Sequence, residues 1–118
     1  MNANEILEYC LAEKNGVEET FPFNPETLVL KVGGKMFLLM SLEKQPLSIA
    51  VKTDPEWSAE LREQYPQING AYHMNKTHWN SVICEGLKQE LIVNLIDHSY
   101  ELVLKALPKK IREEVLNS

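Results

Sequence analysis

The side chains with the most potential for chemistry lie in one segment, from Gln64 to Cys84. These 21 residues contain no Asp or Glu, although the chain of 118 residues has 17 acidic side chains and a formal net charge of −5. The centre of the segment reads Ala71-Tyr72-His73-Met74-Asn75-Lys76-Thr77-His78-Trp79. Imidazole, ammonium, amide and indole groups gathered in this way could serve metal binding, nucleophilic catalysis, nucleic-acid binding or protein binding.

The sequence lacks the additional residues that a metal site or a nucleophilic catalyst would need. A metal site needs at least three convergent ligands, but His73 and His78 are five residues apart, which fits neither one face of a helix nor one face of a strand. Cys84 would need a general base and an orienting group at fixed distances, and no pattern supplies them. Cys10 and Cys84 form no CxxC pair, so we expect two reduced, packed thiols. We therefore predict a protein that is not an enzyme, with no metal site, no cofactor and no catalytic residue.

Nucleic-acid binding uses the residue types of this segment more fully. Lys76 could contact a phosphate, neighbouring amide and hydroxyl groups could donate hydrogen bonds, and Trp79 could stack on or wedge against a base. Two lysines outside the segment would extend the positive patch if the fold brings them near. The predicted contact residues are His73, Asn75, Lys76, His78, Trp79, Lys35 and Lys52. The net charge of −5 restricts such binding to a local, weak and salt-dependent contact.

The aromatic residues of the segment also have a structural interpretation. Tyr72 and Trp79 could be core side chains whose polar tips are hydrogen-bonded by neighbouring Asn and His residues. Sequence patterns leave both interpretations open.

Short-range signals place a helix and three strands in the first half of the chain. Asn2 and Glu5 have the spacing of a capping box, which predicts a helix from about Asn2 to Lys14. Gly33-Gly34 supplies the positive φ that a two-residue hairpin turn needs. The predicted strands are Thr27–Val32, Lys35–Ser41 and Leu47–Thr53.

A tight turn also fixes which side chains of the hairpin share a face. The predicted pairs are Val32–Lys35, Leu30–Phe37 and Leu28–Leu39. The opposite face then mixes aliphatic, methionine and lysine side chains, namely Val29, Lys31, Met36, Leu38 and Met40. Such a face could bind a protein or peptide, so an interaction module or chaperone-like adaptor is the alternative function.

The second half of the chain is predicted to add helices and at least one strand. Asp54 is a suitable N-cap and Pro55 suits the first helical position, so a helix is expected from there to about Gln64. The other predicted elements are a strand at Asn80–Glu85, a long amphipathic helix at Lys88–Leu107 and a short helix after Pro108. This order predicts an α+β fold in which helices pack on one face of a largely antiparallel sheet, as a single domain over residues 1–118.

The run from Ala71 to Val82 resembles the signature of the MmcQ/YjbR family of small bacterial proteins. Further stretches fit the same family: Glu19–Phe23, Val32–Phe37, Lys52–Glu56, Leu95–Tyr100 and Leu107–Lys110. The resemblance covers nearly the whole chain. Gly70, where the family often has proline, is a small departure that affects loop stiffness more than chemistry.

The resemblance implies a two-layer α-β3-α-β2-α fold related to type III secretion chaperones, with Tyr72 to Asn75 on a strand. Members of the family are labelled DNA-binding, from a proposed double-wing arrangement. By position, this label points to the five candidates between residues 73 and 79 as contact residues and supplies no catalytic residue. A bacterial DNA-binding protein is therefore the first expectation.

The sequence also predicts where the protein acts. The longest apolar run, Met36 to Met40, has five residues, far fewer than the roughly 20 of a membrane-spanning helix. The first residues lack the basic start and apolar stretch of a signal peptide. We expect a cytoplasmic protein without membrane contact, a monomer or weak homodimer, whose partner is DNA or alternatively a protein or peptide.

Overall fold

The computed structural model describes residues 1–72 and 74–118, so the predicted contact residue His73 lies outside the described residues. The elements are α1 Ala3–Glu13, β1 Val17–Thr20, β2 Thr27–Val32, β3 Lys35–Ser41, β4 Ser48–Lys52, α2 Pro55–Gln64, β5 Ile68–Gly70, β6 Trp79–Ile83, α3 Gln89–Ala106 and α4 Lys109–Leu116. None of the described helices is long and apolar enough to cross a membrane.

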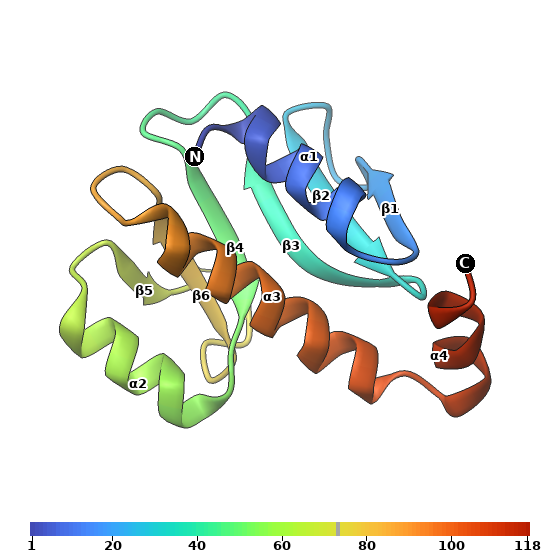
Figure 1. The fold of residues 1–118 in the computed structure, drawn as a ribbon. Coiled ribbons are helices and arrows are strands. Elements are labelled where there is room, and N and C mark those ends of the chain that lie inside the picture. The colour runs from blue at the N-terminus through green and yellow to red at the C-terminus, as the bar shows by residue number, and fades with distance from the viewer. Residues whose placement is uncertain (73) are drawn as a thin grey trace.

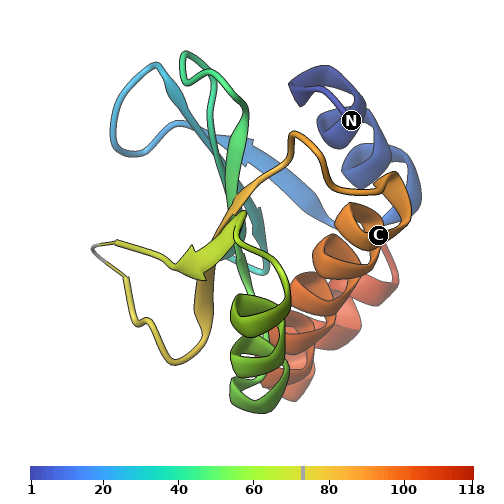
Figure 2. The same ribbon diagram turned by 90° about the vertical axis from the view of Figure 1, so that its left-hand side faces the viewer.

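The six strands form one antiparallel sheet in the order β1-β2-β3-β4-β6-β5. The helices α1, α2 and α3 lie on one side of this sheet, as Figures 1 and 2 show. The connections β1–β2, β3–β4 and β5–β6 project from the other side (Figure 2). We call the helix-covered side the inner face and the opposite side the outer face. This two-layer α+β arrangement confirms the predicted fold class.

The predicted capping signals begin the first two helices. The Asn2 side chain accepts a hydrogen bond from the Glu5 backbone N–H at 2.8 Å, and the Glu5 carboxylate accepts one from the Asn2 N–H at 2.9 Å. Asp54 caps α2 by accepting from the Trp57 N–H at 3.0 Å, and Pro55 is the first helical residue. Both interactions satisfy N–H groups that a helix start leaves unpaired.

The predicted hairpin register is correct at the turn and wrong beyond it. Val32 lies opposite Lys35, but Lys31 pairs with Met36 while Leu30 pairs with Leu38. Phe37 is therefore an extra residue in β3, which makes this a β-bulge. The bulge lets two consecutive side chains, Phe37 and Leu38, both lie fully buried on the inner side.

The bulge also corrects the mixed face on which the adaptor hypothesis rests. Leu38 and Met40 belong to the hydrophobic core and do not line the outer face. Val29 is fully buried but outside that core cluster, as its position on the outer side requires. The outer face of the hairpin is consequently less apolar than the sequence pattern predicts.

Two segments differ from the expected element order. Strand β1 is an addition, because Glu18 and Glu19 give it no apolar alternation and its backbone pairing with β2 is what orders it. The segment from Tyr72 to Asn75 forms a turn and loop at its described residues and is not a strand. The Met74 N–H donates to the Ala71 carbonyl at 3.3 Å, which turns the chain immediately after β5.

Helix α3 covers the centre of the inner face and supplies much of the core. Its residues Ile92, Leu95 and Ile96 are fully buried at the period that the sequence predicts. The core therefore lies between α1, α3 and the sheet, and the outer face carries its own smaller set of buried side chains.

Candidate nucleic-acid interface

The loop that joins β5 to β6, residues 71–78, holds most of the predicted contact residues. The Ala71 N–H donates to the Trp79 carbonyl at 3.0 Å, and the Trp79 N–H donates to the Asn75 carbonyl at 2.9 Å, so the base of the loop is closed. The Asn75 side chain accepts from the Thr77 N–H at 3.0 Å. This local bond fixes a turn and leaves Lys76 exposed beside Asn75.

Lys76 also interacts with an exposed aromatic ring in the same loop. Its Nζ lies 5.6 Å from the centroid of the Tyr72 ring, a cation–π distance. The Tyr72 side chain is 75% exposed, so a positive charge and a flat ring are presented together at the surface. Tyr72 is thus a surface residue, as a stacking role requires and a core role does not.

Arg62 of α2 holds this loop in place. Its guanidinium donates to the Lys76 carbonyl at 2.5 Å, to the Trp79 carbonyl at 3.2 Å and, through Nε, to Asn80 Oδ1 at 2.9 Å. The rigid fork of arginine suits three fixed acceptors better than the single ammonium of lysine does. Sequence reasoning missed Arg62, because a cation in the last turn of a helix is typical of a surface residue that complements the helix dipole.

Asn80 completes a buried polar network behind the loop. The side chains of Asn80, Thr53 and Ser58 are almost fully buried. Asn80 Nδ2 donates to Thr53 Oγ1 at 2.8 Å and to the His78 carbonyl at 3.2 Å, and the Thr53 and Ser58 hydroxyls bond to each other. The network ties the end of β4, the helix α2 and the start of β6 together, so it determines where the loop lies.

Trp79 and His78 have structural surroundings. The Trp79 side chain is 8% exposed and stands outside the main core cluster, on the outer face opposite Lys52. A ring buried to this degree has little surface left for stacking on a base. His78 is half-buried, and its carbonyl accepts from the Thr53 N–H at 2.8 Å, so its backbone secures the junction of β4 and α2.

Lys35 and Lys52 come together at a gap in the sheet. Both line a cavity of about 310 Å³ between the start of β3 and the end of β4, with α3 residues Val103 and Ala106 on its other side. None of the described residues of the 71–78 loop lines this cavity. The predicted lysines therefore form two groups. Lys35 and Lys52 share this cavity, and Lys76 lies in the 71–78 loop. The pairing of Lys52 with Trp79, the residue that follows the loop, connects the two groups.

Ser99 explains why the sheet opens at this cavity. The bulge at Phe37 separates β3 from β4, and the fully buried Ser99 hydroxyl of α3 bridges the two strands. It donates to the Phe37 carbonyl at 2.5 Å and accepts from the Lys52 N–H at 2.8 Å. A side chain of α3 therefore replaces a bond of the strand ladder and sets the backbone from which Lys52 projects.

The outward positions of the six strands carry lysines and a single carboxylate. Side chains alternate along a strand, so the core residues of the inner face identify the outward set. Among the charged residues this set contains Lys31, Lys52 and one acid, Glu18, which lies opposite Lys31. In a chain where acids outnumber bases by 17 to 12, the outer face is depleted of negative charge.

An outer-face groove of about 210 Å³ lies beside the 71–78 loop. Tyr72 and Met74 of the loop form one wall, and Lys44 stands among the residues that line it. The Ser48 and Ser81 hydroxyls, 3.3 Å apart, contribute polar groups from the sheet. Its described lining contains no carboxylate, so the groove continues the acid-free surface of the loop.

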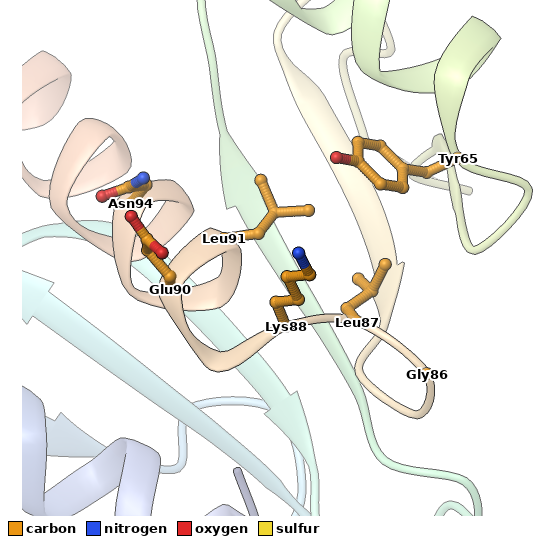
Figure 3. A pocket seen from close by; sticks show the side chains of 7 residues that line it. All are labelled: Tyr65, Gly86, Leu87, Lys88, Glu90, Leu91 and Asn94. Carbon is orange, nitrogen blue, oxygen red and sulfur yellow. The ribbon is translucent and has the colours of Figure 1, made fainter.

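A second pocket, of about 320 Å³, lies away from the predicted residues (Figure 3). It is formed where the Tyr65 ring at the end of α2 faces the start of α3, with Lys88, Glu90 and Leu91 around it. Lysine and glutamate side chains stand side by side in this lining. The pocket therefore has no excess of positive charge and contains none of the predicted contact residues.

Cys10, Cys84 and His98 have structural surroundings. Burial raises the pKa of Cys84 to about 11 and that of Cys10 to about 12, so neither thiol is a ready nucleophile at neutral pH. His98 accepts from the Asp54 N–H at 3.2 Å and packs edge-on against Trp57. Among the described residues, no group of three His, Cys, Asp or Glu side chains could hold a metal ion.

Comparison with known proteins identifies the family. The family model described as YjbR matches residues 12–102, more than half of the chain. The chain belongs to the YjbR family. The expected family is thereby confirmed, and the 71–82 run that resembles its signature lies inside the matched range.

Relatives of this YjbR-family protein match it along almost their full length. The uncharacterized protein YbdF of Escherichia coli O157:H7 is 41% identical over 113 residues, 95% of this chain and 93% of that protein. The uncharacterized protein YjbR of Escherichia coli K12 is 31% identical over 114 residues, 96% of each chain. These names state no activity for either relative.

Solved structures show the same fold. The crystal structure of the Deinococcus radiodurans protein DR2400, of the domain family DUF419, has a TM-score of 0.89 and 39% identity, covering 98% of this chain and 88% of that one. A crystal structure of a Pseudomonas syringae protein has a TM-score of 0.73 and 29% identity, covering 87% of this chain and 99% of that one.

Proposed function

We propose that this YjbR-family protein is a non-enzymatic, cytoplasmic nucleic-acid-binding protein that contacts the phosphate backbone through its outer face. The observation that carries the proposal is the separation of charge: the outward strand positions carry Lys31, Lys52 and one carboxylate, Glu18, and the acid-free 71–78 loop adds Lys76. Backbone contact needs a locally positive surface and does not need a basic protein.

The contact residues of this proposal are a changed version of the predicted set. Lys76 and Lys52 contact phosphates, and Asn75 offers its amide group to the backbone. Lys35 lies opposite the core residue Val32, on the helix-covered side, and is left out of this contact. Tyr72, exposed beside Lys76, takes the stacking role that the sequence analysis gave to Trp79. The buried Trp79 instead supports the strand pair that positions Lys52.

The arrangement also supports weak binding over tight binding. Two lysines contribute only a few phosphate contacts, and each contact to duplex DNA adds about 0.9 to the salt slope of the logarithm of affinity. The formal net charge of −5 opposes contact with a second segment of DNA. We therefore expect affinity that falls steeply between low and physiological salt.

The test is a titration of a fluorescent mixed-sequence DNA duplex with wild type and a Lys52→Ala/Lys76→Ala variant at several salt concentrations. We expect measurable binding at ~50 mM salt and a salt slope reduced by about two in the variant, one for each lost phosphate contact. Fluorescence anisotropy measures both quantities.

Lys88→Ala is the matched control, because Lys88 is an exposed lysine at the start of α3, on the helical side of the molecule. It should leave the affinity and the salt slope unchanged. Absence of salt-sensitive binding by wild type at ~50 mM, or an equal loss in the Lys88→Ala variant, contradicts the proposal.

A further inference from the structure

A second surface, at the opposite end of the hairpin from the Gly33-Gly34 turn, exposes large apolar side chains. Phe21 is 48% exposed, Phe23 is 64% exposed and Leu42 is 39% exposed. All three follow the ends of strands that meet there, β1 and β3. Exposed aromatic and aliphatic side chains grouped in this way are typical of an interaction surface.

Phe21 and Leu42 border a groove of about 310 Å³ between α1 and the sheet. Phe23 lies beside it, in a neighbouring hollow that Phe21 also lines. Ala3 and Leu7 of α1 form one wall, Phe21 and Leu42 form the other, and Met40 closes the floor. Met40 is only 1% exposed, so the floor belongs to the ordered core. The groove therefore has a fixed apolar base and exposed apolar walls. We call it the α1 groove.

Two carboxylates lie at the rim of the α1 groove. Glu19 lines it, and the exposed Glu8 accepts a hydrogen bond at 3.1 Å from the amide of Asn4, which also lines it. The ion pair Lys14–Asp97 and the contact of His98 with Asp54 involve neither of these carboxylates. Lys44 lies two residues after Leu42 in the chain, but it lines the outer-face groove and not the α1 groove.

The charge of the rim decides between the partners that an apolar groove could accept. Nucleic acid is repelled by the carboxylates of Glu19 and Glu8. A second copy of the chain would bring two acidic rims together, and like charges across an interface disfavour association. A segment that carries both bulky apolar side chains and Lys or Arg can pack in the apolar groove and form ion pairs with the carboxylates at its rim.

We propose that the α1 groove docks a basic amphipathic segment of another protein. The apolar side chains of the segment enter between Leu7 and Phe21, and its cations pair with Glu19 and Glu8. Docking of an amphipathic segment in an apolar groove is a common mode of protein recognition. The groove shares no residue with the lysines of the outer face, so this function is separate from nucleic-acid binding.

The test uses a labelled helical peptide of about 18 residues built from Leu and Lys at amphipathic spacing, and its counterpart with Glu in place of Lys. We expect the Leu/Lys peptide to bind and the Leu/Glu peptide not to bind. A Phe21→Ser/Phe23→Ser variant should bind the basic peptide about tenfold more weakly, as expected for loss of aromatic anchors. Glu19→Gln should weaken it and make it less salt-dependent.

The matched control removes two exposed apolar side chains from α4, Ile111 and Leu116, which are 37% and 53% exposed. An Ile111→Ser/Leu116→Ser variant should bind the basic peptide as wild type does, and so should the Lys52→Ala/Lys76→Ala variant, which separates this proposal from the nucleic-acid one. Failure of the basic peptide to bind, equal binding of both peptides, or equal weakening by the α4 variant overturns the proposal. A dimer in light scattering that becomes a monomer in the Phe21→Ser/Phe23→Ser variant also overturns it, because a second copy would then occupy the groove.

Discussion

Replacing Asn80 with alanine is expected to lower the free energy of unfolding by about 3 to 4 kcal/mol. The substitution removes the acceptor of Arg62 Nε and the donor to Thr53 and His78, and it leaves buried polar groups without partners. Networks of this kind are costly to break in part, because each orphaned group loses water without regaining a bond. Chemical denaturation followed by tryptophan fluorescence measures the change.

Asn69→Ala provides the matched control for this substitution. Asn69 is an exposed asparagine on the neighbouring strand β5, and its side chain makes a single bond of 3.2 Å to the Pro66 carbonyl. We expect a loss of no more than about 0.5 kcal/mol there, which is usual for surface substitutions. A loss at Asn80 as small as that at Asn69 would mean that the buried network does not hold the 71–78 loop.

Replacing Ser99 with alanine is expected to lower the free energy of unfolding by about 2 to 3 kcal/mol, since it orphans two buried backbone groups, the Phe37 carbonyl and the Lys52 N–H. Removing one hydroxyl from the partly buried Ser48–Ser81 pair should cost less, because no backbone group loses its partner, so Ser81→Ala, which loses the 3.3 Å contact with Ser48, is the comparison. Thermal unfolding of both variants checks the order. If Ser81→Ala proves as destabilising as Ser99→Ala, the bridge between β3 and β4 is not a significant source of stability.

Features fixed by neighbouring residues were predictable from the sequence. The capping box of Asn2 and Glu5, the Asp54-Pro55 helix start and the Gly33-Gly34 turn each depend on residues within three positions of one another. Their physics is local, so the fold class and most of the element order followed from them. Hydrophobic periodicity then indicated which side of α3 faces the sheet.

Features that depend on distant contacts were not predictable in the same way. The bulge at Phe37 exists because the core accepts one more large side chain, and no local signal marks it. Ser99 reaches the backbone of strands more than 40 residues away in sequence. Arg62 anchors the 71–78 loop only because α2 lies beside β6. For these reasons the hairpin faces were misassigned and the support of the candidate site was missed.

In the candidate site, too, local features were predictable from the sequence and long-range features were not. The acid-free segment indicated the right region, because charge composition can be counted without knowing the fold. Which aromatic ring is exposed, Tyr72 or Trp79, depends on where the loop folds against β4, so the sequence left both interpretations open. The structure places Tyr72 at the surface and Trp79 in the interior.

The most direct test of the outer-face proposal is a titration of ¹⁵N-labelled protein with a short DNA duplex at ~50 mM salt, followed by amide chemical shifts. The account predicts that the largest shifts occur in Asn75, Lys76 and Lys52 and in neighbouring residues of the outer-face groove, and that they reverse when salt is added. Shifts centred on α1 and α3, or no shifts at all, would contradict it.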